Sequence, residues 1–320
     1  MTTDLSAAEA VFNYAFYRSF LGWSGEMLKL TSFLIDDQPH LDLTDVYGFG
    51  AWSAQSGLAA ITNKEIRALS VRTSPTAWDY KTELTNKQVR DTKGVLPQIA
   101  AAAATRFLED VTDVFAGKFY NANTTAHPEN SVVGSPYAAN GGGTVYMADV
   151  FDMTFVNGGT KTQQNFYQLQ LGDTSLATIV QNRVDYRERG GERASMPGEK
   201  PWLVTGPSKM VLGQDLAEQE GRIYDGTGLQ SGWRNRVAGT VLLPSFGTDG
   251  WALVWRRQHT AYGPNGETVT FTRCPVWVHM RLLPKFRLFQ GDKNTIAAIG
   301  EAEYAVGYFP FEGDFALSKP

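Results

Sequence analysis

The sequence is poor in the residues that carry enzyme chemistry. Its single cysteine, Cys274, cannot form a disulfide within the chain, which is typical of proteins that fold in a reducing cytoplasm. The four histidines are scattered, and neither H-E-x-x-H nor C-x-x-C occurs, so the pattern predicts no metal site. No apolar run approaches the roughly 18 residues that cross a bilayer, and we expect no membrane partner.

Signatures of nucleotide binding and of nucleophilic catalysis are missing as well. The glycine-rich segment 158–162 lacks the G-x-x-x-x-G-K-[ST] order of a phosphate-binding loop, and no G-x-S-x-G elbow is present. Cys274 could act as a nucleophile with His259 or His279 as its base, but positions 274 and 279 face opposite sides of a continuous strand. A bend at Pro275 would change that parity, and a buried, inert cysteine is the preferred interpretation. The sequence therefore predicts no catalytic residue and no cofactor.

The composition is that of a folded protein with many aromatic side chains. Hydrophobic residues make up 42% of the chain and charged residues 19%, which excludes a disordered chain. The net charge of −4 and the pI of about 5.7 do not fit a dedicated nucleic-acid binder, which would carry a concentrated basic face. Aromatic residues reach 12%, and on segments too thin to have a core of their own they need a partner surface.

The N-terminal segment predicts a short helix with more aromatic surface than one helix normally buries. Ser6 and Glu9 have the spacing of a capping box, and Gly22 ends the pattern. The aromatic side chains fall on more than one face, whereas a terminal helix usually buries a single stripe. They are Phe12, Tyr14, Phe16, Tyr17 and Phe20, with Trp23 just beyond the helix. We therefore expect this segment to need a partner.

The next two patterned segments predict a long β-hairpin. Residues 61–73 and 77–89 have the pattern of strands joined at residues 74–76, and in the second strand Trp78 and Tyr80 alternate with charged side chains. An isolated two-stranded ribbon is at best marginally stable in water. The ribbon therefore either packs on its own domain or lies across a neighbouring molecule.

The strongest helical pattern covers residues 97–117. Pro97 suits its first turn and Gly117 suits its C-terminal cap. Acidic residues near its end stand at the unfavourable pole of the helix dipole, so either basic groups from elsewhere offset them or they are simply solvated. These acids are Glu109, Asp110 and Asp113.

The rest of the chain predicts one more long helix and mostly strands. The helix covers residues 174–189, with Asp173 as its N-cap. Residues 251–262 and 267–283 predict a hairpin, because the sequence Pro-Asn-Gly separates them. Long helices packed on antiparallel strands make the expected fold class α+β.

A cluster of arginines follows the start of the second long helix. It consists of Arg183, Arg187, Arg189 and Arg193, interleaved with Asp185, Glu188 and Glu192. Because the net charge of the cluster is small, the pattern suits bidentate arginine–carboxylate pairs, within or between subunits, better than contact with phosphates.

Four stretches, taken in order, carry a resemblance to a known family. The strand 78–89 leads into the helix 97–117 as the family's extended hairpin leads into its spine helix. The helix 174–189 precedes a segment similar to the family's connector, in which a proline-marked turn is followed by a strand and a proline-started helix. The connector and the two remaining stretches, a "G…G…V…LP" segment and a closing strand, are residues 196–207, 228–244 and 302–310. Together they resemble the major capsid proteins of tailed phages, whose Hong Kong 97-type shell fold is shared by encapsulins.

The resemblance implies an α+β chain with the Hong Kong 97-like capsid fold. Its parts would be an N-terminal arm (1–50), an extended β-hairpin loop (51–94), a peripheral domain with a long spine helix (95–130), an axial domain (131–250), and strands that return to the peripheral domain and close the chain (251–320).

The implied function is structural and not enzymatic. A major capsid protein assembles with itself, in pentamers and hexamers, into an icosahedral phage head around double-stranded DNA. The expected partners are sister copies, decoration or portal proteins, and packaged DNA bound without sequence preference; the expected location is the virion capsid, after synthesis in the host cytoplasm. Two alternatives stay open, an encapsulin-like compartment for protein cargo and a β-rich carbohydrate-binding or hydrolytic protein. Candidate contacts between subunits are Phe12, Phe16, Phe20, Trp23, Trp78, Tyr80, Arg187, Arg189 and Arg193.

Overall fold

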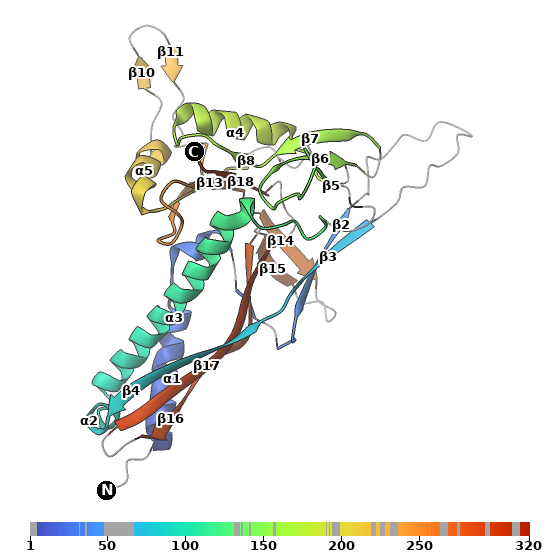
Figure 1. The fold of residues 1–320 in the computed structure, drawn as a ribbon. Coiled ribbons are helices and arrows are strands. Elements are labelled where there is room, and N and C mark those ends of the chain that lie inside the picture. The colour runs from blue at the N-terminus through green and yellow to red at the C-terminus, as the bar shows by residue number, and fades with distance from the viewer. Residues whose placement is uncertain are drawn as a thin grey trace.

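The molecule is elongated, with a narrow part built on one long helix and a long sheet, and a broader part made of shorter elements (Figure 1). This computed structural model describes the chain except for residues 1–4, 32, 36, 48–66, 131–134, 136, 141, 156–157, 190, 192, 194–198, 219–221, 225–227, 231–235, 256, 263–267, 274–275, 292–294 and 309–313.

A four-stranded sheet forms the base of the narrow part, with the strand order β1-β16-β17-β4. β16 and β17 are antiparallel, as are β17 and β4, whereas β1 runs parallel to β16. Buried and less buried side chains alternate along most of β17, as expected for a strand that covers a core with one face. The four strands are β1 (Phe33–Ile35), β4 (Thr76–Thr85), β16 (Val276–Gln290) and β17 (Thr295–Tyr308).

Two helices, α1 (Leu5–Leu21) and α3 (Val95–Tyr120), pack against each other and against one face of this sheet (Figure 1). Asn13 of α1 anchors the helix on β16. Its side-chain amide donates a hydrogen bond to the carbonyl oxygen of Phe286 at 2.9 Å, and its side-chain oxygen accepts one from the N–H of Phe286, also at 2.9 Å. The two bonds satisfy both backbone groups of one strand residue, so they fix where α1 crosses the sheet.

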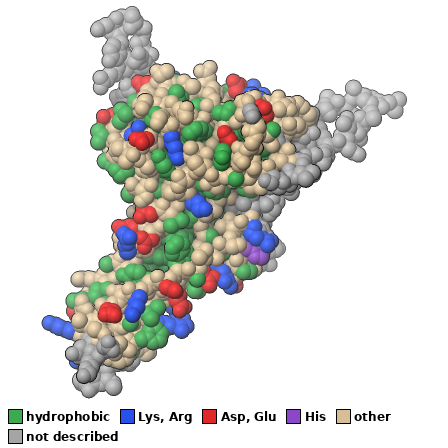
Figure 2. Space-filling model, in the orientation of Figure 1, with side chains coloured by type: hydrophobic (Ala, Val, Ile, Leu, Met, Phe, Trp, Pro, Cys, Tyr) green, Lys and Arg blue, Asp and Glu red, His purple; other side chains and the backbone are tan. Residues whose placement is uncertain are grey.

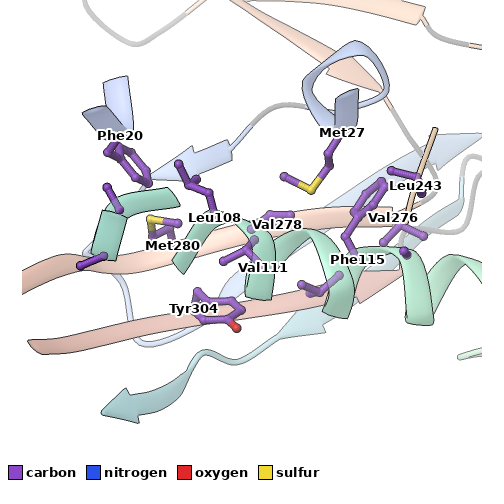
Figure 3. Packing of buried hydrophobic residues seen from close by; sticks show 14 of the residues in the cluster. Phe20, Met27, Leu108, Val111, Phe115, Leu243, Val276, Val278, Met280 and Tyr304 are labelled. Atoms are coloured by element: carbon purple, nitrogen blue, oxygen red, sulfur yellow. The ribbon is translucent and has the colours of Figure 1, made fainter. Parts of the chain in front are cut away.

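The main core lies between these helices and the sheet. Figure 3 shows Leu108, Val111 and Phe115 on α3 lying over Val278 and Met280 of β16. Phe20 and Met27, from the N-terminal segment, close the core from the other side (Figure 3). Burial of each such side chain stabilises the fold by about 1.5–3 kcal/mol, so this layer holds the narrow part together.

α3 is longer than the pattern in the sequence predicts. It begins at Val95, where the carboxylate of Asp91 accepts hydrogen bonds from the N–H groups of Gly94 at 2.9 Å and Val95 at 3.1 Å. It also continues through Gly117, because Phe119 on the next turn is fully buried in the core. The predicted helix end at Gly117 is therefore wrong.

This extension changes the environment of the acids on α3. Glu109, Asp110 and Asp113 lie about two to three turns before its end, beyond the last turn in which the helix dipole acts on a charge. Within the helix, Arg106 pairs with Glu109 at 3.5 Å and with Asp110 at 3.0 Å. The basic group that faces these two acids thus comes from the same helix.

The broader part contains a five-stranded sheet in the order β12-β9-β13-β18-β8. Its core is a second cluster of buried side chains around Trp251, whose indole N–H donates a hydrogen bond to the carbonyl oxygen of Leu169 at 2.8 Å. The elements of this layer are β8 (Phe166–Tyr167), α4 (Asp173–Asp185), β9 (Trp202–Thr205), α5 (Met210–Glu218), β12 (Gly239–Leu242), β13 (Trp251–Val254) and β18 (Phe315–Ser318).

Smaller elements complete the described chain. The strands β5 (Tyr137–Ala139), β6 (Val150–Thr154) and β7 (Thr160–Gln164) form a three-stranded sheet. Three strand pairs stand apart: β2 (Leu41–Tyr47) with β3 (Arg67–Thr73), β10 (Arg222–Tyr224) with β11 (Gly228–Gln230), and β14 (Arg257–Tyr262) with β15 (Thr268–Arg273). The short helices are η1 (Glu26–Lys29), α2 (Asn86–Arg90), η2 (Asn121–Asn123) and η3 (Pro207–Lys209).

The predicted hairpin of residues 61–73 with 77–89 is wrong in its pairing. β3 pairs with β2, and β4 pairs with β17 over the register from Thr76↔Tyr304 to Thr85↔Thr295. The second strand also ends earlier than predicted, since Thr85 and Gln88 form a capping box that starts α2. A two-stranded ribbon does exist, but it is β2 with β3, so only one of its strands falls within the predicted range of 61–89.

Other predictions hold in part. In the predicted connector, the strand β9 and the helix that starts at Pro207 are confirmed, whereas the proline-marked turn at residues 196–198 lies outside the described residues. The helix predicted over 174–189 ends at Asp185, and its N-cap is Gly172 and not Asp173. The predicted pairing within 251–283 is confirmed for β14 with β15, but the flanking strands β13 and β16 join two different sheets. Residues 251–320 therefore do not all return to the narrow part, because β13 and β18 belong to the five-stranded sheet.

Candidate interaction surface

No cluster that could hold a metal ion occurs among the described residues. In the same part of the chain, none of the helices combines the length and hydrophobicity required to span a bilayer. The possible Cys274–histidine pair stays untested, because Cys274 lies outside the described residues. His279 is on β16 and fully buried.

The aromatic face of α1 is not such a surface. Phe12, Phe16 and Phe20 are buried in the chain's own core, on one stripe that faces α3 and β16. The ring of Phe16 lies 5.0 Å from Phe286 and 6.4 Å from Phe107. Trp23 is half-buried against the same core. The expectation that Phe12, Phe16 and Phe20 need a second copy for their burial is corrected, since one stripe at four-residue spacing suffices.

Trp78 and Tyr80, by contrast, are exposed on β4, the outermost strand of the four-stranded sheet within the described chain. Trp78 is 45% exposed and Tyr80 41%. The indole of Trp78 stacks on the ring of Tyr304 at 5.0 Å, and its N–H donates a hydrogen bond to the carbonyl oxygen of Tyr304 at 3.4 Å. Tyr80 meets the ring of Phe286 edge-on at 6.0 Å. Each ring is thus packed on the chain's own core in part and exposed in part.

These two rings form the outer wall of a groove of about 300 Å³ between α3 and the sheet. The opposite wall is a face of α3 with Ala103, Phe107 and Val114, and the floor includes Phe286 and Tyr304. In Figure 2 hydrophobic side chains gather on this middle stretch of the molecule, with acidic side chains beside them. We call this the α3–β4 groove.

The α3–β4 groove is acidic. Asp79, Asp110, Asp113 and Glu301 line it, and none of its lining residues in the described chain is a lysine or arginine. Asp110 has Arg106 beside it on the helix surface, and Asp113 accepts a hydrogen bond from the hydroxyl of Ser245. No cation lies within 4.0 Å of Asp113 among the described residues.

The groove also perturbs a tyrosine. Burial, and secondarily the negative charge of Asp110, raise the pKa of Tyr304 to about 12. The hydroxyl of Tyr304 therefore stays protonated at any physiological pH. The groove thus offers apolar ring faces and carboxylates, which suit an apolar segment that carries a positive charge.

The arginine cluster divides between structural and surface roles. Arg183 is buried, pairs with Asp314 at 3.1 Å, and lies over the ring of Trp255 at 5.1 Å. Arg189 is also buried, donates a hydrogen bond to the hydroxyl of Tyr137 and lies over its ring. The expectation that Arg189 contacts another subunit is therefore corrected, because the charge is already held inside the chain.

The other two arginines keep some exposure. The backbone of Arg187 exchanges hydrogen bonds with the side chain of Gln163, at 2.6 and 2.7 Å, and pairs with Arg193 in a short β-bridge. Arg193 is exposed and Arg187 half-buried. Five of the predicted contacts keep exposed surface and remain predictions: Trp23, Trp78, Tyr80, Arg187 and Arg193.

The sequence does contain a pattern that indicates the groove, although it was not among the predicted contacts. Ala103, Phe107, Asp110 and Val114 recur at intervals of four, three and four residues, so they share one face of a helix. An acid in the middle of an otherwise apolar stripe is unusual for a face packed in a core. That combination marks a face that is only partly covered.

Comparison with known proteins supports the fold. No family model matches the sequence, and neither does any curated protein. Among solved structures, the chain is similar to that of a virus-like particle from Pyrococcus furiosus, with 8% identity, a TM-score of 0.50, and coverage of 97% of this chain and 98% of that one. It is also similar to a chain in the asymmetric unit of the bacteriophage PhiM1 mature capsid, with 10% identity, a TM-score of 0.52, and coverage of 93% and 87%.

Both similarities extend over nearly the whole of each chain. The predicted α+β fold of the Hong Kong 97 type is therefore confirmed for this chain. At this level of identity the agreement concerns the fold, and the function has to be argued from the surfaces.

Proposed function

We propose that this protein is a structural subunit that assembles with copies of itself, as pentamers and hexamers, into the icosahedral head of a tailed phage enclosing double-stranded DNA. The observation that carries the proposal is the fold, which is shared almost end to end with chains of a virus-like particle and of a mature phage capsid. The proposal makes the protein a component of the virion capsid with no catalytic role.

The shape of the chain supports this proposal. The β2–β3 ribbon consists of two strands that pair only with each other in the described chain, and an isolated pair of strands is at best marginally stable in water. The ribbon is attached at its base, where Thr73 is buried against Gly307 of β17. We propose that beyond this anchor the ribbon gains stability by lying on another molecule.

The exposed aromatic residues also indicate contact between subunits. Trp78 and Tyr80 are of the residue types that contribute most at protein interfaces, and both are partly exposed. We propose that they contact a sister subunit, together with Arg187 and Arg193. Repetition of one contact around symmetry axes closes a shell without open edges.

The partners follow from the proposed role. Sister copies are the main partner; portal and decoration proteins and non-specifically bound DNA are further ones. The encapsulin-like compartment shares the fold and differs in its contents. The carbohydrate-binding or hydrolytic alternative is not favoured, since the shell fold accounts for nearly the whole chain.

The test is to express the full chain, purify it, and examine it by negative-stain electron microscopy, with measurement of nuclease-protected DNA. We expect closed particles of uniform diameter, and DNA in particles isolated from an infected host. Particles that hold a protein cargo and no DNA would assign the chain to a protein compartment instead. A chain that stays monomeric at high concentration would contradict the proposal.

A further inference from the structure

The outward face of α1 is apolar and positively charged. Tyr14 and Leu21 are 70% and 78% exposed, the two highest values among the large hydrophobic side chains described. Arg18 lies between them, and spacings of four and three residues place all three on one face of the helix. Exposed apolar patches of this kind mark interaction sites.

No negative charge opposes Arg18 on this helix. The only acid in α1 is Glu9, and its carboxylate is turned to the sheet, where it accepts a hydrogen bond from the N–H of Leu288 at 3.1 Å. The face formed by Tyr14, Arg18 and Leu21 therefore presents two apolar side chains and one cation. We call it the outer face of α1.

The α3–β4 groove has the complementary character. It offers the partly exposed rings of Trp78 and Tyr80 to apolar side chains. It also presents Asp110 and Asp113 from α3. Arg106 pairs with Asp110 on the helix surface, and no lysine or arginine is among the lining residues of the groove in the described chain. When two apolar surfaces carry opposite charges, the charges favour contact between these two surfaces over other contacts and fix how the surfaces are oriented.

The two surfaces cannot meet within one subunit. Phe12 and Phe16 hold the inner face of α1 on Phe286, so Tyr14, half a helical turn away, points away from α3. The groove lies over β17 and β4, whereas α1 lies over β16, with α3 between them. Any contact between the outer face of α1 and the α3–β4 groove therefore joins two copies.

We propose that the outer face of α1 of one copy docks in the α3–β4 groove of the next copy. Leu21 and Tyr14 cover the rings of Trp78 and Tyr80, and Arg18 pairs with Asp110 and Asp113. The proposal rests on the proposed self-assembly and names the two surfaces that meet. Because the two surfaces differ, repeating the contact head to tail generates a ring when the rotation closes.

The test compares the protein concentration at which particles form for charge-reversed variants. Arg18→Glu and Asp110→Lys should each raise that concentration roughly tenfold, since each replaces an attraction by a repulsion. The double variant carrying both changes should return to within about threefold of the unmodified chain, because the pair is restored with its signs exchanged.

Matched controls separate this contact from general effects. Glu109→Lys removes a partner of the same Arg106 from the same helix, but Glu109 does not line the groove. Lys87→Glu reverses an exposed charge on α2, away from both surfaces. Both controls should assemble like the unmodified chain. The thermal midpoint of the unassembled subunit should be the same for all variants within about 2 °C, as for surface substitutions in general.

The outcomes are distinguishable from a failure of the proposed function. If the unmodified chain forms no particles, self-assembly itself is refuted. If it forms particles and the two single variants assemble at the same concentration as it does, the docking of α1 in the groove is refuted while the shell stands. Loss of assembly in both single variants without recovery in the double variant would also refute the contact. Should a reversed charge prevent folding, Leu21→Ala and Tyr14→Ala provide the same comparison without a charge change.

Discussion

The substitution Phe16→Ala tests whether α1 belongs to the core of the subunit or is a detachable arm. The ring of Phe16 is fully buried and contacts Phe286, Phe107 and Phe20 at centroid distances of 5.0, 6.4 and 6.4 Å. Its removal leaves a cavity between α1, α3 and β16. Truncation of a buried phenylalanine to alanine lowers the free energy of unfolding by about 3–5 kcal/mol.

Tyr14→Ala on the opposite face of the same helix is the matched control. Tyr14 is 70% exposed, so we expect a change within about 0.5 kcal/mol. Both values are measured by urea unfolding of the subunit, monitored by far-ultraviolet circular dichroism at a protein concentration below that at which particles form. The dependence of the free energy of unfolding on urea concentration should be the same for both variants. If Phe16→Ala were as mild as Tyr14→Ala, α1 would not be packed on α3 in solution and the description of the core would be wrong.

Three further predictions concern other parts of the chain. Trp78→Ala and Tyr80→Ala should raise the concentration required for particle formation about tenfold while changing the free energy of unfolding by only about 1 kcal/mol; equal losses in both measurements would contradict their role between subunits. Asp314→Ala should destabilise the subunit by about 3 kcal/mol, because it removes the nearer of the two carboxylates beside the buried Arg183, with Glu199 left at 4.0 Å. Glu83→Ala, which breaks the exposed pair with Lys81, should cost less than about 1 kcal/mol, and similar urea midpoints for the two variants would refute this. Tyr304 should ionise at a pH of about 12, as seen in tyrosinate absorbance, and Asp110→Asn should lower that pKa. The pKa of Tyr304 in the folded subunit lies above the ordinary value of 10.0, so the contribution of neutral Tyr304 to the free energy of unfolding is complete below pH 10.0 and is lost as the pH rises toward about 12. Tyr304→Phe should remove this part of the loss of stability at alkaline pH.

The fold class followed from the sequence because its strongest elements have local causes. The stripe of apolar residues in α3 and the alternation in β4 are properties of single segments, and both predicted the right kind of element. The end of α3 could not be predicted in the same way. Gly117 resembles a C-cap, but the helix continues because Phe119 packs on Phe315 at 5.5 Å, and this contact outweighs the cost of about 1 kcal/mol for glycine in a helix.

Strand partners and the role of α1 depend on contacts far apart in the chain. The alternation in β4 says that the segment is a strand, but not that its partner is β17, more than 200 residues away. In α1 the four-residue spacing of Phe12, Phe16 and Phe20 was visible in the sequence, yet Tyr14 and Tyr17 between them obscured the single stripe. The partner of that stripe, Phe286, is 273 residues from Asn13, and no local pattern indicates it.

Of the residues that line the α3–β4 groove, only the exposed aromatic ones could be predicted from the sequence. The sequence predicted exposed rings at Trp78 and Tyr80 because a ribbon without a core would leave them open. The rings are partly exposed for a different reason, since β4 is an edge strand of the four-stranded sheet and not part of a ribbon. The acids of the groove could not be placed beside them, because Asp110 and Trp78 come together only through the packing of α3 on the sheet.

Electron cryomicroscopy of particles formed by the unmodified chain tests the central claim most directly. The account predicts a closed shell in which density from a neighbouring subunit covers Trp78 and Tyr80 in every copy. A chain that sediments as a single subunit at the highest attainable concentration, with those rings still exposed to water, would contradict it.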